Sequence, residues 1–133
     1  MNRRMYKVIG KPVAWARPSQ TVNGIRYDSQ KDEKKDYGFQ LLRCHRGGLI
    51  DRPMIVMLTF FVEIPKSSKK IEPLDYRTVR PDLSNLIKFI EDAANGVIWK
   101  DDSLIVELQA KKVYDFNPRT EMIIIEVDNE SRK

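Results

Sequence analysis

The chain has 133 residues and a formal net charge of +5, with 32% charged and 41% hydrophobic residues. This length suits one compact domain, predicted to span residues 1–133, and the composition argues against a disordered chain. No apolar run approaches the ~20 residues of a membrane-spanning helix and the N-terminus has no long apolar segment, so the sequence predicts a cytoplasmic protein.

Basic residues gather in two segments, residues 1–28 and residues 66–80. The first contains Arg3, Arg4, Lys7, Lys11, Arg17 and Arg26 against one acidic residue, and the second contains Lys66, Lys69, Lys70, Arg77 and Arg80 against two. Because the rest of the chain is net acidic, this distribution is typical of a protein that attracts a polyanion and holds a metal at its centre. The alternative is an ordinary solvated basic surface.

The N-terminal region is predicted to begin with strands. Residues 5–9 and 13–17 have the composition of short strands. Asn23 and Gly24 follow, flanked by apolar residues, and both tolerate positive φ. They therefore predict a β-hairpin.

A helix is expected over residues 29–46. Ser29 followed three residues later by Asp32 is typical of a capped helix start. The pair Gly47-Gly48 marks its end, because glycine readily adopts the left-handed conformation that closes a helix.

Residues 54–64 are rich in β-branched and aromatic residues and predict a central strand. One face of this strand is fully apolar: Met54, Val56, Leu58, Phe60, Val62 and Ile64. Residues 65–81 contain three prolines and five basic residues, which predicts a long exposed loop. Loops of this length are usually functional or mobile.

A second, amphipathic helix follows the loop. At 100° per residue its apolar side chains fall within an arc of about 120°. These are Leu83, Leu86, Ile87, Ile90, Ala93 and Ala94, whereas Ser84, Asn85, Lys88, Glu91 and Asp92 lie outside the arc. Asn95-Gly96 then ends the helix.

The C-terminal third alternates with the period of strands. Leu104, Val106, Leu108 and Ala110 share one side and Glu107, Gln109 and Lys111 the other, and a last strand follows the turn at residues 115–119. These two strands are expected to form an antiparallel hairpin. The predicted fold class is α+β, with a mixed, mostly antiparallel small sheet and two helices packed on it.

Four aspartates lie in or beside the second helix: Asp82, Asp92, Asp101 and Asp102. At 1.5 Å per residue Asp82 and Asp92 are about 15 Å apart, too far to share one ion. Residues 94–102 reach about 26 Å when extended. A chain that turns after the helix is therefore expected to bring Asp101 and Asp102 level with Asp82.

Carboxylates gathered in this way need a compensating cation. Cys44 and His45 are the only residues of their types, which excludes an internal disulfide and a zinc site built on cysteines. An all-oxygen site selects a hard ion such as Mg²⁺ or Mn²⁺. Lys88, on the polar face of the helix, is expected to reach toward a phosphate near Asp82.

Each of these residues also has a structural interpretation. Asp82 after a proline is a good N-cap, and Asp101 and Asp102 are common turn residues. Lys88 suits a solvated helix surface and Trp99 a core. Their combination in one stretch is what favours a functional site over these separate roles.

The stretch RPDLSNLIKFIEDAANGVIWKDDSLI, residues 80–105, resembles the signature of the RusA family of Holliday junction resolvases. In that family a PD-x-D-N-x-x-K helix start, a helix ending in D-A-x-N-G and a W/Y-x-DD-x-x-I segment recur. The predicted order of elements along most of the chain is also similar. The resemblance implies a homodimer that uses Mg²⁺ or Mn²⁺ to place paired nicks in four-way DNA junctions, in DNA recombination and repair.

Residue by residue, the resemblance makes Asp82 the first metal carboxylate, Lys88 the catalytic lysine and Asp102 the late carboxylate, with Asp101 beside it. Ser84 departs from the family pattern, in which many members carry a second aspartate. Asp101, or a water held by Ser84 and Asn85, is the expected compensation. The DNA-binding residues are expected to be Lys66, Lys69, Lys70, Arg77, Arg80 and Arg17.

The expected activity is metal-assisted hydrolysis of a DNA phosphodiester, with an ion at Asp82 and Asp102 and with Lys88 offsetting phosphate charge. Because a four-way junction has two symmetric cleavage points, a two-fold homodimer is the economical arrangement. The alternatives are a junction- or DNA-binding module that has lost catalysis through Ser84, and a small structural protein with a capped helix.

Overall fold

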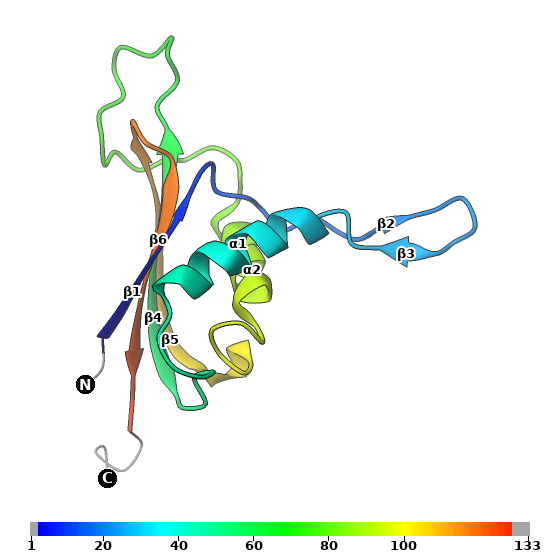
Figure 1. Cartoon of the computed structure of the whole chain (residues 1–133). Helices are drawn as coiled ribbons and strands as arrows, with labels where there is room; N and C mark the ends of the chain where they lie inside the picture. The colour runs from blue at the N-terminus through cyan, green and yellow to red at the C-terminus, as the bar shows by residue number, and fades with distance from the viewer. Residues whose placement is uncertain (1–2, 129–133) are drawn as a thin grey trace.

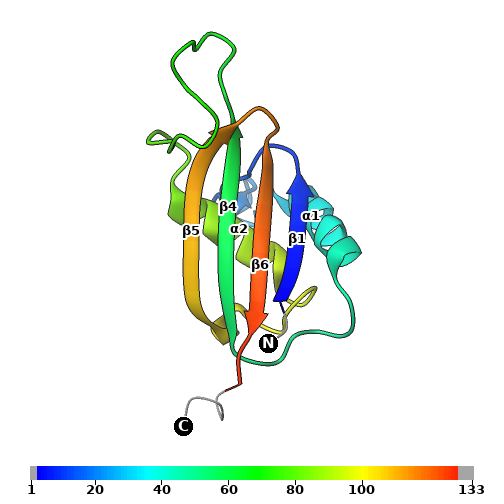
Figure 2. The same ribbon diagram turned by 90° about the vertical axis from the view of Figure 1, so that its left-hand side faces the viewer.

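A four-stranded mixed sheet with both long helices on one face forms the body of the protein (Figure 1). The computed structural model describes residues 3–128. Its sheet has the order β1-β6-β4-β5, with β1 Arg3–Ile9, β4 Met54–Glu63, β5 Ile105–Asp115 and β6 Arg119–Glu126. The helices α1 (Lys31–Cys44) and α2 (Leu83–Ala94) leave the opposite face uncovered (Figure 2). The predicted α+β class is confirmed.

The strand predicted at residues 54–64 is β4, and it is central as expected. It pairs antiparallel with β6 and parallel with β5. The alternate side chains from Met54 to Val62 are buried, so the predicted apolar face packs into the core. Residues 65–81 form the predicted loop, part of which projects beyond the end of the sheet (Figure 1).

The predicted antiparallel hairpin of the last two strands is wrong. Within residues 3–128, β5 and β6 form no ladder with each other, because both pair with β4, which lies between them. A parallel pair needs a long crossover connection, and the loop and α2 provide it between β4 and β5. Part of the expected apolar side of β5 also faces solvent, since Val106 is 55% exposed and Leu108 40%.

The amphipathic helix is α2, and its apolar face packs on the sheet and on α1. Leu86, Ile90 and the two alanines of the predicted arc are buried. Phe89 widens this face, because its ring meets Tyr37 of α1 edge-on at 4.9 Å between centroids. Asn95 is the C-cap and Gly96 has a φ of 74°, so the predicted helix end is confirmed.

The N-terminal predictions hold only in part. The strand at residues 5–9 is confirmed as β1, and the hairpin is confirmed as β2 (Ser19–Gln20) and β3 (Arg26–Tyr27), which project from the body (Figure 1). The strand expected at residues 13–17 is wrong: in the described chain that segment is irregular.

The helix expected at residues 29–46 is α1, but its predicted caps are wrong. Gln30, not Ser29, is the N-cap, and its side chain makes no capping hydrogen bond with the described backbone. The helix ends at Cys44, before the glycine pair, because His45 is already extended. Among residues 3–128 no helix is long and apolar enough to cross a membrane.

Candidate functional site

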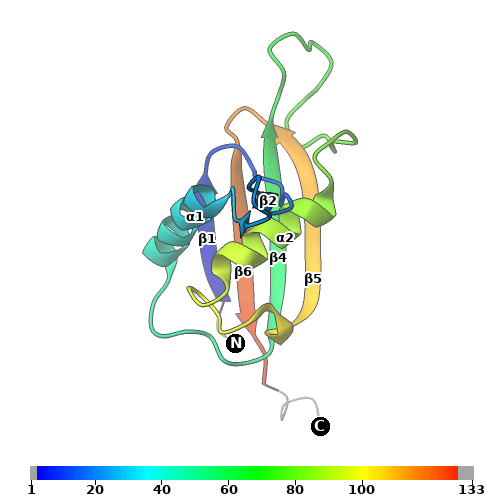
Figure 3. The ribbon, with the colours of Figure 1, turned by 90° about the vertical axis from the view of Figure 1, so that its right-hand side faces the viewer.

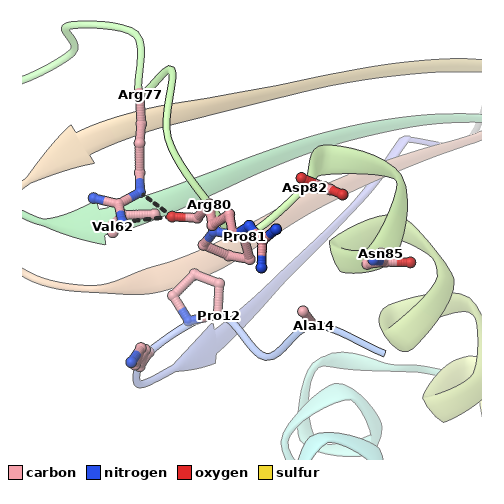
Figure 4. Close-up of a pocket in the computed structure, with 9 residues that line it drawn as sticks. Pro12, Ala14, Val62, Arg77, Arg80, Pro81, Asp82 and Asn85 are labelled. Carbon is pink, nitrogen blue, oxygen red and sulfur yellow. Dashed lines mark hydrogen bonds between the residues drawn. The ribbon is translucent and has the colours of Figure 1, made fainter. Parts of the chain in front are cut away.

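A cleft of about 480 Å³ opens where the 65–81 loop meets the start of α2 (Figure 4). It combines a carboxylate with cationic and small apolar side chains: Lys11, Pro12, Ala14, Val62, Arg77, Arg80, Pro81, Asp82 and Asn85 line it. Cations and the positive end of a helix both attract phosphate. The cleft therefore suits a phosphate group placed next to a carboxylate.

Asp82 occupies the N-cap position of α2, yet within the described residues its carboxylate makes no capping hydrogen bond. Only its backbone carbonyl takes part in the turn, accepting from the amides of Asn85 (3.1 Å) and Leu86 (3.2 Å). The residue is exposed at the cleft (Figure 4). Helix capping thus does not account for this carboxylate, which is left available to a ligand.

Lys112 of β5 fixes the turn that leads into Asp82. Its ammonium donates to the carbonyl of Val79 (2.7 Å) and to that of Pro81 (2.6 Å). Hydrogen bonds from a charged donor are stronger than neutral ones. Lys112 was not among the predicted site residues, because the sequence pattern shows only an alternating strand there.

Arg77 holds the same turn from the loop side. Its Nε donates to the carbonyl of Arg80 at 2.9 Å, and its Nη2 donates to the same oxygen (Figure 4). Its Nη1 donates to the Tyr114 hydroxyl at 3.2 Å. The guanidinium also lies over the Tyr114 ring, 5.4 Å from its centroid. Arg77, predicted to bind DNA, therefore has intramolecular partners for most of its donors.

Lys88 lies in the middle of α2 and is exposed. Its ammonium sits 3.6 Å from the centroid of the Trp15 ring, a cation–π contact that the sequence did not predict. Asn85 lines the cleft beside Asp82, and Ser84 is exposed in the first turn of the helix.

Asp102 is held at the other end of α2. Its Oδ2 accepts from Asn95 Nδ2 at 3.1 Å, and Asn95 Oδ1 accepts from the indole nitrogen of Trp99 at 2.6 Å. Trp99 is fully buried, so its predicted core position is confirmed. This chain of hydrogen bonds fixes the Asp102 carboxylate relative to the core.

Asp101 caps the short 3-10 helix Asp102–Leu104. Its carboxylate accepts from the Ser103 amide at 3.1 Å. Hydrogen bonds from the side chain and amide of Ser103 hold the pKa of Asp101 below its ordinary value. The turn role that the sequence also suggested is therefore present at Asp101.

The expected return of Asp101 and Asp102 to the level of Asp82 is wrong within one chain. Asp82 precedes α2, the helix that lies across the sheet in Figure 3. Asp102 bonds to Asn95 at the far end of this helix, so about 20 Å of helix axis separates the two sites. Among residues 3–128 no group of three histidine, cysteine, aspartate or glutamate side chains is placed to hold a metal ion. One chain alone does not assemble the predicted three-carboxylate centre.

Glu91 is an acidic residue near Asp102 that the sequence did not single out as a site residue. Burial, and then the Asp102 and Asp92 carboxylates, raise the pKa of Glu91 above its ordinary value. The only indication of a site role for Glu91 in the sequence is its position in α2, one turn before Asn95. The fold thus brings carboxylates together at the end of α2, but at the opposite end from Asp82.

The predicted DNA-binding residues are divided between three places. Lys66, Lys69 and Lys70 are exposed on the projecting loop, and Arg17 is exposed just before the β2–β3 hairpin. Arg80 lines the cleft with Lys11, which sequence reasoning counted only as part of a basic segment.

Comparison with known proteins places this chain among nucleases. The family model of endodeoxyribonuclease RusA matches residues 10–125. The chain is 32% identical to the uncharacterized protein YqaN of Bacillus subtilis (strain 168), over 92% of its own length and 95% of that protein. It is also 40% identical to the crossover junction endodeoxyribonuclease rusA of Lactococcus phage r1t, over 56% of each chain.

We expect Lys112→Met to destabilise the protein by about 1–2 kcal/mol, because two backbone carbonyls before Asp82 lose a charged donor at a partly exposed site. Urea unfolding and limited proteolysis of the 65–81 loop would measure this. Lys111→Met is the matched control, since neighbouring strand residues point to opposite faces. Equal stability and equal cleavage of the two variants would contradict the role of Lys112.

We expect Glu91→Gln to raise the unfolding temperature at pH 7 in metal-free buffer. Because the folded-state pKa of Glu91 is raised, its charged form destabilises the fold as pH rises through that pKa, whereas below the ordinary value of 4.5 the penalty is absent. The gain should therefore vanish below about pH 4. Thermal melts at both pH values would check this, with the exposed Glu63→Gln as control; a pH-independent difference would contradict it.

Proposed function

The chain belongs to the RusA family of endodeoxyribonucleases, and we propose that it resolves four-way DNA junctions by paired symmetric nicks. In this proposal residues 1–133 form one nuclease domain that acts in DNA recombination and repair. The observation that carries the proposal is the Asp82 carboxylate, which makes no capping hydrogen bond to α2 and lies in a cleft with Lys11 and Arg80. A carboxylate left free among cations suits phosphodiester chemistry better than helix capping.

We propose that residues in different places in the structure bind the scissile phosphate, offset its charge and bind the junction arms. Arg80 and Lys11 bind the scissile phosphate in the cleft, and Lys88 offsets the charge that develops on it during hydrolysis. The exposed lysines of the loop, Lys66, Lys69 and Lys70, bind a junction arm, as does Arg17. Arg77 contributes mainly by holding the turn at Arg80.

Mg²⁺ or Mn²⁺ is the proposed cofactor, because carboxylate and amide oxygens favour hard ions. When bound, such an ion supplies Lewis-acid activation of phosphate and water. The proposed ligands are Asp82, Asp102 and Asp101, with Ser84 and Asn85 in support. Because Asp82 and Asp102 lie at opposite ends of α2, these ligands do not fit one ion within a single chain.

We propose that the protein acts as a homodimer. A four-way junction offers two symmetric cleavage points, which two copies related by a two-fold axis match. The separation of Asp82 from Asp102 adds a second reason. If both contact one ion, they must come from different chains.

The function is tested by incubating the protein with a synthetic four-way junction in a Mg²⁺ titration. Wild type should nick it symmetrically, and Asp82→Asn should lose about 100-fold or more in nicking rate while it still binds the junction. Ser84→Asp adds a carboxylate in the first turn of α2 and should lower the Mg²⁺ concentration needed for half-maximal rate.

Two outcomes would contradict the proposal in different ways. Undiminished nicking by Asp82→Asn would remove Asp82 from the active site. A wild-type chain that binds junctions and never cuts them, with cutting restored by Ser84→Asp, would make the protein a binding module that has lost catalysis.

Mixing two inactive variants tests whether the ligands come from two chains. Asp82→Asn and Asp102→Asn chains, unfolded and refolded together, form heterodimers in which one of the two shared centres keeps both carboxylates. Such a mixture should nick one strand of a junction and not complete its resolution. If ligands come from one chain, no centre is intact and the mixture stays inactive, as each variant does alone.

A further inference from the structure

The segment from Val13 to Ala16 has no regular secondary structure, yet hydrogen bonds to both helices fix it. The Val13 amide donates to the Tyr37 hydroxyl (3.1 Å). The Ala16 amide donates to Gln30 Oε1 (2.9 Å), and Gln30 Nε2 donates back to the Ala14 carbonyl (2.8 Å). Gln30 is itself buried, which makes this pairing costly to break.

Trp15 is fixed by the same segment. Its backbone amide donates to the carbonyl of Asn85 in α2 at 2.9 Å. Asn85 lies one turn before Lys88, and Ala14 and Asn85 both line the cleft that holds Asp82. The Trp15 backbone is thereby attached to the helix that carries the proposed catalytic residues.

In this position the ring of Trp15 contacts a cation. The Lys88 ammonium lies 3.6 Å from the centroid of its ring, well within the range of a cation–π interaction. A lysine side chain has four flexible carbons and high rotamer entropy in solvent. An aromatic face that holds the ammonium removes part of that freedom and leaves N–H donors pointing away from the ring.

We propose that Trp15 is a positioning residue for Lys88, holding its ammonium ready beside the phosphate-binding cleft. This inference rests on the proposed nuclease function. Trp15 acts through Lys88 and not on the DNA, so its ring should matter for the rate of the nicking step and not for junction affinity. This role also gives a reason why residues 13–17 do not form the predicted strand. The hydrogen bonds of the segment position the Trp15 ring instead of pairing with a neighbouring strand.

The test compares an aromatic with an apolar replacement. Trp15→Phe keeps a π face, whereas Trp15→Leu keeps apolar bulk without one. Under single-turnover conditions with saturating enzyme, Trp15→Leu should nick about 3- to 30-fold more slowly than wild type and Trp15→Phe should retain most of the rate. Junction dissociation constants measured without divalent metal should stay within about twofold. Phe39→Leu, at an exposed aromatic residue of α1, is the control and should match wild type.

A spectroscopic readout tests the contact without catalysis. The indole N–H signal of Trp15, assigned in ¹⁵N-correlated NMR spectra by its loss in Trp15→Phe, should shift in Lys88→Met and not in Lys111→Met. An unshifted signal in Lys88→Met would overturn the contact in solution. This measurement still decides the question if Trp15→Leu does not fold.

The outcomes separate this inference from the proposed function. Equal nicking by Trp15→Leu and Trp15→Phe would overturn it, because the presence of a π face would then make no difference to the rate. A loss of junction affinity at an unchanged nicking rate would also overturn it and assign Trp15 to base stacking. A wild-type chain that never nicks a junction would overturn the proposed function and this inference together.

Discussion

Because β5 runs parallel to β4, the chain that leaves β4 must travel back along the sheet before it can enter β5. Residues 64–104 make that return, and α2 covers most of the distance. The start of α2, with Asp82, therefore lies near the end of β4. Its C-terminal end carries Asn95, which bonds to Asp102 three residues before β5 begins. The separation of the two proposed metal carboxylates is a direct consequence of this one pairing.

The cations around the cleft do not have equal freedom to bind DNA. Lys112 and Arg77 donate to three successive backbone carbonyls, those of residues 79–81, and so fix the entry to α2. Lys11 and Arg80 line the same cleft. A count of basic residues along the sequence therefore overstates the number of cations available to phosphate. Some of these cations already donate hydrogen bonds to backbone carbonyls of the protein's own turn.

Local patterns predicted the parts of the fold that local chemistry determines. The apolar period of α2, the glycine after it, and the β-branched and aromatic content of β4 were all sufficient to place those elements. The β5–β6 hairpin failed because alternation describes a strand but not its partner. Residues 13–17 failed because the donors and acceptors that fix this segment, on Tyr37, Gln30 and Asn85, come from distant parts of the chain.

The candidate site likewise combines residues that the local sequence predicted with residues that only the fold brings there. Asp82, Asn85 and Arg80 were predicted in separate roles as a metal carboxylate, a supporting residue and a DNA-binding residue, and the structure places all three at one cleft. Lys112 and Trp15 reach the site from strands and loops far away in sequence. Asp102 was assigned to the same centre as Asp82 from the length of the segment that follows the helix. That length sets how far the segment can reach, but not the direction in which it runs.

Keeping Asp82 apart from Asp102 has a physical advantage for a protein that must fold before it meets a metal. Two carboxylates close enough to share an ion repel each other when the ion is absent. Burial is the larger cause of the raised pKa of Glu91, and repulsion from Asp102 adds to it. With Asp82 at the far end of α2, the folded chain avoids adding a fourth carboxylate to Glu91, Asp92 and Asp102. In the proposed dimer the cost would arise only when two chains meet, where a bound metal ion would offset it. Assembly and metal binding would then be coupled, and an isolated chain would not cut DNA.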